Sequence, residues 1–159
     1  MIRNTVTGLF CTILLLLHSC AEDDVSKIPD YLVFGHFYGF CIGESCIQIY
    51  KLENDKLYMD TSHQYPRYDE FYLGAYVEME DSLFGLVNDL RDHFPEQLLY
   101  EQDTVFGCPD CADQGGLYIE YKSDNIHKYW IIDQFAGNVP VYLHQYMDKV
   151  NEKIDLLNN

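Results

Sequence analysis

The sequence predicts a single domain of the α+β class, in which antiparallel hairpins form a sheet packed against about two helices. Two pairs of alternating segments, each joined by a short polar turn, indicate the hairpins. Two other segments repeat apolar residues at helical spacing. No internal repeat or change in composition divides residues 30–159, so this part of the chain is expected to form one domain.

The first strands are predicted near the start of the domain. Residues 31–39 alternate between two faces, one of which carries Leu32, Phe34, His36 and Tyr38. Residues 46–51 alternate as well, and residues 56–60 return as their hairpin partner after the turn residues 53–55. This region therefore predicts three strands.

The middle of the chain predicts a loop, a further strand and a helix. Residues 61–70 are polar and contain Pro66, which favours a loop, and residues 71–79 are predicted to form a strand. Residues 81–93 predict a helix that Asp81 or Ser82 can cap and that Pro95 ends. Its apolar positions are Leu83, Leu86, Val87 and Leu90.

The last third predicts a loop, a hairpin and a long helix. Residues 106–116 are rich in Cys, Gly and Asp and are expected to form a loop. Residues 117–122 and 126–133 are the predicted strands of the second hairpin. The final helix starts near Pro140 and carries an apolar stripe of Val139, Leu143, Tyr146, Val150, Ile154 and Leu157.

Composition excludes several classes of protein. The hydrophobic fraction of 48% is too high for a disordered chain. With 26 acidic and 10 basic residues, the net charge of −16 would repel a phosphate backbone, so no nucleic-acid partner is expected. The charge instead suits a cationic partner, or it is a generic acidic surface. No apolar run reaches the roughly 18 residues that a membrane-spanning helix needs.

The N-terminus has the pattern of an export signal. Arg3 precedes an apolar segment over residues 9–17, and the segment ends at Leu17-His18-Ser19-Cys20. This sequence resembles the lipobox of bacterial lipoprotein precursors. The resemblance implies that residues 1–19 are a signal peptide and that Cys20 is acylated after cleavage. Residues 20–29 would then be a lipidated linker that attaches the domain to a membrane.

Acidic residues follow the lipobox directly, as Ala21-Glu22-Asp23-Asp24. The tract resembles the export signal of surface-displayed lipoproteins of Bacteroidota. This resemblance implies an outer-membrane lipoprotein exposed at the cell surface. The same residues are also suited to a solvated tether on the periplasmic leaflet, and the sequence does not decide between the two locations.

Four cysteines remain in the predicted domain, Cys41 and Cys46 in a C-x4-C pair and Cys108 and Cys111 in a C-x2-C pair. Exported thiols are usually oxidised, which favours two disulfides, paired either within or across the two motifs. Two closely spaced pairs can also bind one Zn²⁺ ion tetrahedrally, and zinc is therefore the alternative to a domain without cofactors. A redox-active thiol pair is disfavoured, because a strand rather than a helix follows Cys111.

Other candidate sites have weaker patterns. Asp110 and Asp113 could coordinate Ca²⁺, but their spacing does not match an EF-hand loop and suits turn capping better. The histidines of the predicted domain are scattered and form no metal or catalytic motif; they are His36, His63, His93, His127 and His144. No nucleophile elbow or phosphate-binding glycine loop is present.

Tyrosine is unusually frequent, with 14 residues, several of them in the predicted loop after the first hairpin. Tyr65, Arg67, Tyr68 and Tyr72 form a candidate recognition loop for a protein or a glycan, because tyrosine combines a flat apolar ring with a hydroxyl. A tyrosine-rich core is the alternative. The sequence thus favours an anchored, non-catalytic binding domain, with a zinc-binding lipoprotein and an enzyme as the other hypotheses.

Overall fold

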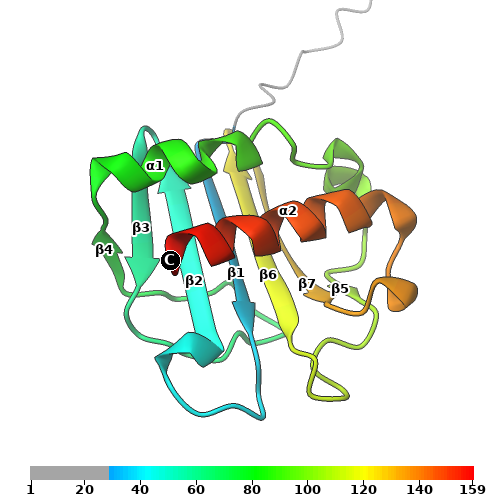
Figure 1. Cartoon of the computed structure of the whole chain (residues 1–159). Coiled ribbons are helices and arrows are strands. Elements are labelled where there is room, and N and C mark those ends of the chain that lie inside the picture. Colours follow the sequence, from blue (N-terminus) through cyan, green and yellow to red (C-terminus); the bar gives the residue numbers. More distant parts are fainter. Residues whose placement is uncertain (1–28) are drawn as a thin grey trace, which may run out of the picture.

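A computed structural model describes residues 29–159 as a seven-stranded sheet with two helices packed on one face (Figure 1). The sheet order is β4-β3-β2-β1-β6-β7-β5, and every pairing is antiparallel except the parallel one between β5 and β7. The strands are β1 (Tyr31–Phe37), β2 (Ile47–Glu53), β3 (Lys56–Asp60), β4 (Tyr76–Glu78), β5 (Val105–Phe106), β6 (Gly116–Ser123) and β7 (Ile126–Asp133). The predicted α+β class and both predicted hairpins are confirmed.

The helical layer consists of α1 (Asp81–Val87) and the long α2 (Val141–Leu157), which crosses the sheet diagonally (Figure 1). Four short 3₁₀ helices lie in the connections: η1 (Glu44–Cys46), η2 (Asn88–Leu90), η3 (Glu96–Tyr100) and η4 (Ala136–Asn138). Among residues 29–159, no helix is long and apolar enough to cross a membrane.

The main core lies between the sheet and the helices. Leu32 and Phe34 of β1 and Trp130 of β7 are at most 1% exposed there, and they pack with the apolar stripe of α2. This stripe is the predicted one, and its buried members include Leu143, Tyr146, Val150 and Ile154. Burial of these side chains is the main stabilising contribution to the fold, at about 1.5–3 kcal/mol for each large apolar residue.

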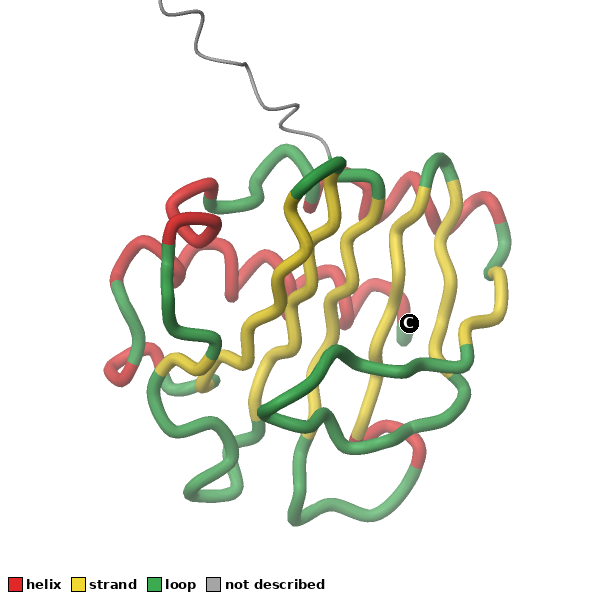
Figure 2. The backbone as a smooth tube through the Cα atoms, turned by 180° about the vertical axis from the view of Figure 1, so that it is seen from behind, coloured by secondary structure: helices red, strands yellow, loops and turns green. Residues whose placement is uncertain are grey.

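The rear face of the sheet is also buried, which the alternation in β1 does not predict. Val33 and Phe37 point away from the helices into a second cluster with Tyr118. The segment 61–75, which connects β3 to β4, covers this cluster and contributes Tyr72. It is the long loop that crosses the lower part of the sheet in the rear view (Figure 2). The domain therefore has three layers, of which the third is irregular.

Two predicted elements are shorter in the structure. Only Tyr76–Glu78 of the predicted strand 71–79 is a strand, because side chains bind backbone groups before it: Tyr72 N donates to the Tyr118 hydroxyl and Ala75 N to Asp60. The predicted helix 81–93 has α geometry only to Val87, where the backbone leaves the helical region at φ −125°. The poor helix formers Asn88 and Asp89 follow in a 3₁₀ turn.

Candidate functional site

Three loops meet at one end of the sheet, which we call the loop end: residues 38–46, 61–75 and 107–115. β1 finishes at this end with Phe37, opposite the first residues of β2 and β6, Ile47 and Gly116. The described chain enters at the other end, where Asp30 accepts a hydrogen bond from the backbone of Asp124 in the β6–β7 turn. Figure 1 shows the two ends on opposite sides of the domain.

Two disulfides close two of these loops. Cys41 is bonded to Cys46, and Cys108 is bonded to Cys111, with Cα–Cα distances of 5.6 and 5.5 Å. The predicted disulfides are thus confirmed, and they pair within each motif rather than across the motifs. In residues 29–159, no three His, Cys, Asp or Glu side chains are grouped in a way that could hold a metal ion. The cysteines therefore act as a framework for the loops.

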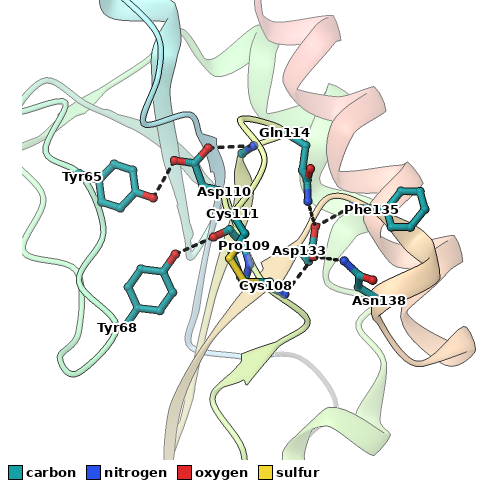
Figure 3. Close-up of a disulfide and its surroundings, with 11 residues drawn as sticks. Tyr65, Tyr68, Cys108, Pro109, Asp110, Cys111, Gln114, Asp133, Phe135 and Asn138 are labelled. Atoms are coloured by element: carbon teal, nitrogen blue, oxygen red, sulfur yellow. Dashed lines mark hydrogen bonds between the residues drawn. A yellow bond between two sulfur atoms is a disulfide. The ribbon is translucent and has the colours of Figure 1, made fainter.

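Asp110, in the turn between Cys108 and Cys111, joins all three loops. Figure 3 shows its contact with Tyr65 of the loop 61–75. Its Oδ2 accepts hydrogen bonds from Gly39 N at 2.8 Å and from the Tyr65 hydroxyl at 3.1 Å, while Oδ1 accepts from Gly115 N at 3.1 Å. The backbone of Asp110 has φ +59°, a left-handed conformation that Asp tolerates. A Cβ at position 39 would collide with this carboxylate, so the contact requires glycine.

Two tyrosines of the candidate recognition loop pack onto this turn. Tyr68 donates to the Pro109 carbonyl at 3.0 Å, and Tyr65 packs edge-on against Phe37 with ring centres 4.9 Å apart. Burial, with hydrogen bonding to Tyr68 and Asp110, raises the pKa of Tyr65 far above its usual range, so its hydroxyl remains a donor. Both tyrosines are 39% exposed, and they present one side to solvent.

The other two residues of that candidate loop have different surroundings. Arg67 is exposed and forms ion pairs with Asp69 and Glu70, at 3.3 and 2.9 Å. Tyr72 is buried in the rear cluster, and its hydroxyl donates to Asp60 at 2.7 Å. Tyr72 is therefore part of the tyrosine-rich core, whereas Tyr65, Arg67 and Tyr68 lie at the surface of the loop end.

A second carboxylate, Asp133, supports the same turn from the end of β7 (Figure 3). It is fully buried and accepts hydrogen bonds from Cys108 N, Phe135 N, Gln114 Nε2 and Asn138 Nδ2, at 2.6–3.0 Å. Burial alone raises the pKa of Asp133, but these four hydrogen bonds together outweigh burial and hold the pKa below its ordinary value. Asp133 is thus ionised, and it ties the disulfide turn to the connection that leads into α2.

The loop 38–46 carries an apolar tip, which we define as Phe40 and Ile42. Phe40 is 86% exposed and Ile42 is fully exposed. Cys41, which lies between these two residues in the sequence, is bonded to Cys46, and Gly39 is bound to Asp110 immediately before them. The tip is therefore held outward on both flanks by covalent and hydrogen-bonded contacts.

The charges of the loop end are mostly negative. Its three loops contain five acidic residues and one basic residue, Arg67, which is already paired with two of them; the acidic residues are Glu44, Asp69, Glu70, Asp110 and Asp113. The loop end that carries the apolar tip is therefore negatively charged.

The described histidines are engaged in local contacts. Ring nitrogens of His36, His63, His93 and His144 each lie within 3.2 Å of a backbone carbonyl oxygen, to which they donate. His127 instead lies 2.9 Å from Glu120, and Phe71 stacks on its ring. These contacts agree with the interpretation of the histidines as structural residues.

Sequence reasoning missed the two organising carboxylates, Asp60 and Asp133. Each is the last residue of a correctly predicted strand, and an acidic residue at that position next to a loop was the available signal. No model of a protein family matches the chain, and no curated protein matches it. The functional conclusion therefore rests on the residues and their geometry.

Proposed function

We propose that this protein is an envelope-anchored lipoprotein whose domain binds a cationic protein through the loop end, without catalysing a reaction. The observation that carries the proposal is the apolar tip, Phe40 and Ile42, held outward by a disulfide and by Asp110. Large exposed apolar side chains on a constrained loop are suited to binding, because little conformational entropy is lost on association. Aromatic side chains in particular anchor interfaces when they enter an apolar pocket.

The position of the loop end supports this proposal. An anchor at Cys20 would reach the domain through Pro29 and Asp30, next to the start of β1. β1 has seven residues, which span about 20 Å at roughly 3.3 Å per residue. The anchor would thus enter at one end of the sheet, and the tip would face away from the membrane. We further propose, from the acidic tract after Cys20, that the anchor lies in the outer membrane with the domain exposed at the cell surface.

Replacing Cys20 with serine should abolish lipidation, because Cys20 supplies the thiol of the lipobox. The test is incorporation of an alkyne-tagged fatty acid in cells, followed by mass analysis of the N-terminal peptide. The wild-type chain should start at an acylated Cys20, and Cys20→Ser should carry no label. Cys11→Ser, which changes a cysteine in the signal segment, should keep the label. Labelling of Cys20→Ser at the wild-type level would overturn the proposed anchor.

Photocrosslinking from the tip tests the proposed binding. A benzophenone amino acid placed at Phe40 in the full chain should give a discrete adduct with a basic protein in living cells. The same group at Tyr100, another aromatic residue that is 80% exposed, is the matched control and should not give this adduct. The additional change Ile42→Asp should remove the adduct from position 40, because a carboxylate cannot enter an apolar pocket cheaply.

Two outcomes would count against a protein partner. Equal adducts from positions 40 and 100 would mean that the tip is not a preferred contact. An adduct that resists protease and is cleaved by glycosidases would show a glycan at the tip in place of a protein.

A further inference from the structure

We propose that the Cys108–Cys111 turn is a redox-responsive latch: Asp110 positions the apolar tip while the disulfide is closed, and reduction of the disulfide by a dithiol releases it. This inference rests on the proposed function in one respect, since the tip is the proposed contact with the partner. The latch itself is a property of the domain and has its own measurable signs.

The disulfide turn is linked to the tip through the carboxylate of Asp110. The bond from Gly39 N to Asp110 Oδ2, at 2.8 Å, connects residues 71 positions apart in the sequence. Gly39 immediately precedes Phe40, so the carboxylate fixes the backbone on one flank of the tip. The same oxygen accepts from Tyr65, and the Tyr68 hydroxyl donates to Pro109. One turn thus determines the position of two other loops.

The position of Asp110 depends on the disulfide. Asp110 lies inside the four-residue loop that Cys108–Cys111 closes, and it has φ +59°. Asp tolerates a positive φ but still favours a negative one, and the closed loop restricts the alternatives. When the disulfide opens, the turn can relax to negative φ, and the carboxylate then moves away from Gly39 and Tyr65.

The two disulfides differ in how accessible they are to an attacking thiolate. Cys108 and Cys111 are both exposed residues, whereas in the other disulfide Cys41 is exposed and Cys46 is only 5% exposed. A thiolate can therefore approach either sulfur of Cys108–Cys111, but only one sulfur of Cys41–Cys46. The strand β6 rather than a helix follows the turn, so no helix N-terminus stabilises a thiolate there. The turn is therefore suited to be a target of reductants rather than an oxidoreductase.

Reduction of Cys108–Cys111 is an ordinary dithiol–disulfide exchange. One thiolate of the dithiol attacks a sulfur of the turn, which breaks the Cys108–Cys111 bond and forms a mixed disulfide. The second thiol of the dithiol then attacks the mixed disulfide. This step releases the protein cysteine as a thiol, and the oxidised reductant departs with an internal disulfide. Two electrons and two protons pass to the protein, so that Cys108 and Cys111 become thiols and the reductant is oxidised.

Graded reduction of the protein purified from the envelope tests the latch. Dithiothreitol is the probe; thiol alkylation with mass analysis identifies which disulfide opens, and hydrogen exchange follows the backbone. Cys108–Cys111 should open at dithiothreitol concentrations at least about tenfold lower than those that open Cys41–Cys46. Exchange at the Gly39 amide should rise by at least about tenfold on this first opening, while β6, β7 and α2 stay protected.

Variants separate the role of Asp110 from a general effect of reduction. Asp110→Ala in the oxidised protein should raise exchange at Gly39 as reduction does, with both disulfides intact. Asp113→Ala is the matched control, because Asp113 lies two residues beyond Cys111, is exposed and also has a positive φ of 58°. It should leave Gly39 protected. An unchanged Gly39 amide in Asp110→Ala would overturn the positioning role.

The remaining outcomes separate the latch from the proposed function. Simultaneous opening of both disulfides, or selective opening without faster exchange at Gly39, would overturn the latch. Crosslinking from position 40 should fall at least about fivefold after selective reduction. An equal yield in the oxidised and reduced protein would overturn control of binding but leave the binding function standing. No adduct in either state would instead contradict the proposed function.

Discussion

Replacing Asp133 with alanine is expected to lower the free energy of unfolding by about 4 kcal/mol. The carboxylate is fully buried and accepts four hydrogen bonds, two of them from the backbone N–H groups of Cys108 and Phe135. These two groups cannot rotate to another acceptor as the side-chain amides of Gln114 and Asn138 can. Both donors are part-buried, and a donor left without a partner where water is excluded costs about 1–3 kcal/mol. Urea unfolding with the disulfides intact measures the loss.

Two further measurements make this prediction specific. Asp148→Ala, at an exposed position of α2, should change the stability by less than about 0.5 kcal/mol. Because the pKa of Asp133 is lowered in the folded state, its contribution to the free energy of unfolding is complete above the unfolded-state pKa of about 3.9. That contribution is lost as the pH falls through the folded-state pKa. Asp133→Asn should remove this part of the acid sensitivity. A loss below about 1 kcal/mol in Asp133→Ala would contradict the assigned role.

Replacing Asp60 with alanine should cost about 3 kcal/mol and should also detach the segment 61–75 from the rear of the sheet. Asp60 is 1% exposed, and four groups of that segment donate to it, at 2.6–2.8 Å: Ser62 Oγ, His63 N, Tyr72 Oη and Ala75 N. Without the carboxylate, these four donors form more favourable hydrogen bonds with water than they do against the sheet, so the segment is expected to separate from it. The predicted result is partial loss of the third layer before global unfolding.

Hydrogen exchange resolves the two effects of this substitution. In Asp60→Ala, amides of residues 61–75 should lose protection first, while those of β1 and β6 remain protected. Asp69→Ala is the control, because Asp69 lies in the same segment but is exposed and pairs only with Arg67 at the surface. It should leave the segment protected. Uniform loss of protection throughout the sheet in Asp60→Ala would show that the segment has no separate stability.

The hairpins could be predicted because the information that forms them is local. The β2–β3 turn has Asn54 at φ 54° and the β6–β7 turn has Asp124 at φ 31°, and Asn and Asp tolerate such angles better than other residues with a side chain. Apolar alternation on either side then fixed the register. The strands on both sides of these turns were predicted to within two residues at each end.

The third layer could not be predicted in the same way, because distant residues hold it. The Tyr118 hydroxyl accepts from the backbone of Tyr72, 46 residues earlier, and Tyr129 donates to the Tyr68 carbonyl over 61 residues. No periodic pattern within residues 61–75 reports such contacts. For this reason the sequence predicts Tyr72 in the candidate recognition loop, whereas the structure places it in the core.

The candidate site was predicted in part. Oxidation of exported thiols correctly predicted two disulfides, but it left open whether they pair within or across the two motifs. The spacing also suits zinc, so only the sulfur–sulfur contacts decide. The role of Asp110 was expected to be turn capping, and its bond to Gly115 N fits that role. Its link to Gly39 depends on β1 and β6 being neighbours, which the order of elements along the chain does not reveal.

The strands at the edges of the sheet are shorter than those inside it. The inner strands β1, β6 and β7 have seven or eight residues, but the outermost strands, β4 and β5, have three and two. At the β4 edge, the short strand offers few unpaired backbone groups to a neighbouring molecule, and Lys56 paired with Glu78 adds charge beside it. Molecules held at high density on a membrane, as proposed here, would therefore find little backbone at this edge with which to join their sheets.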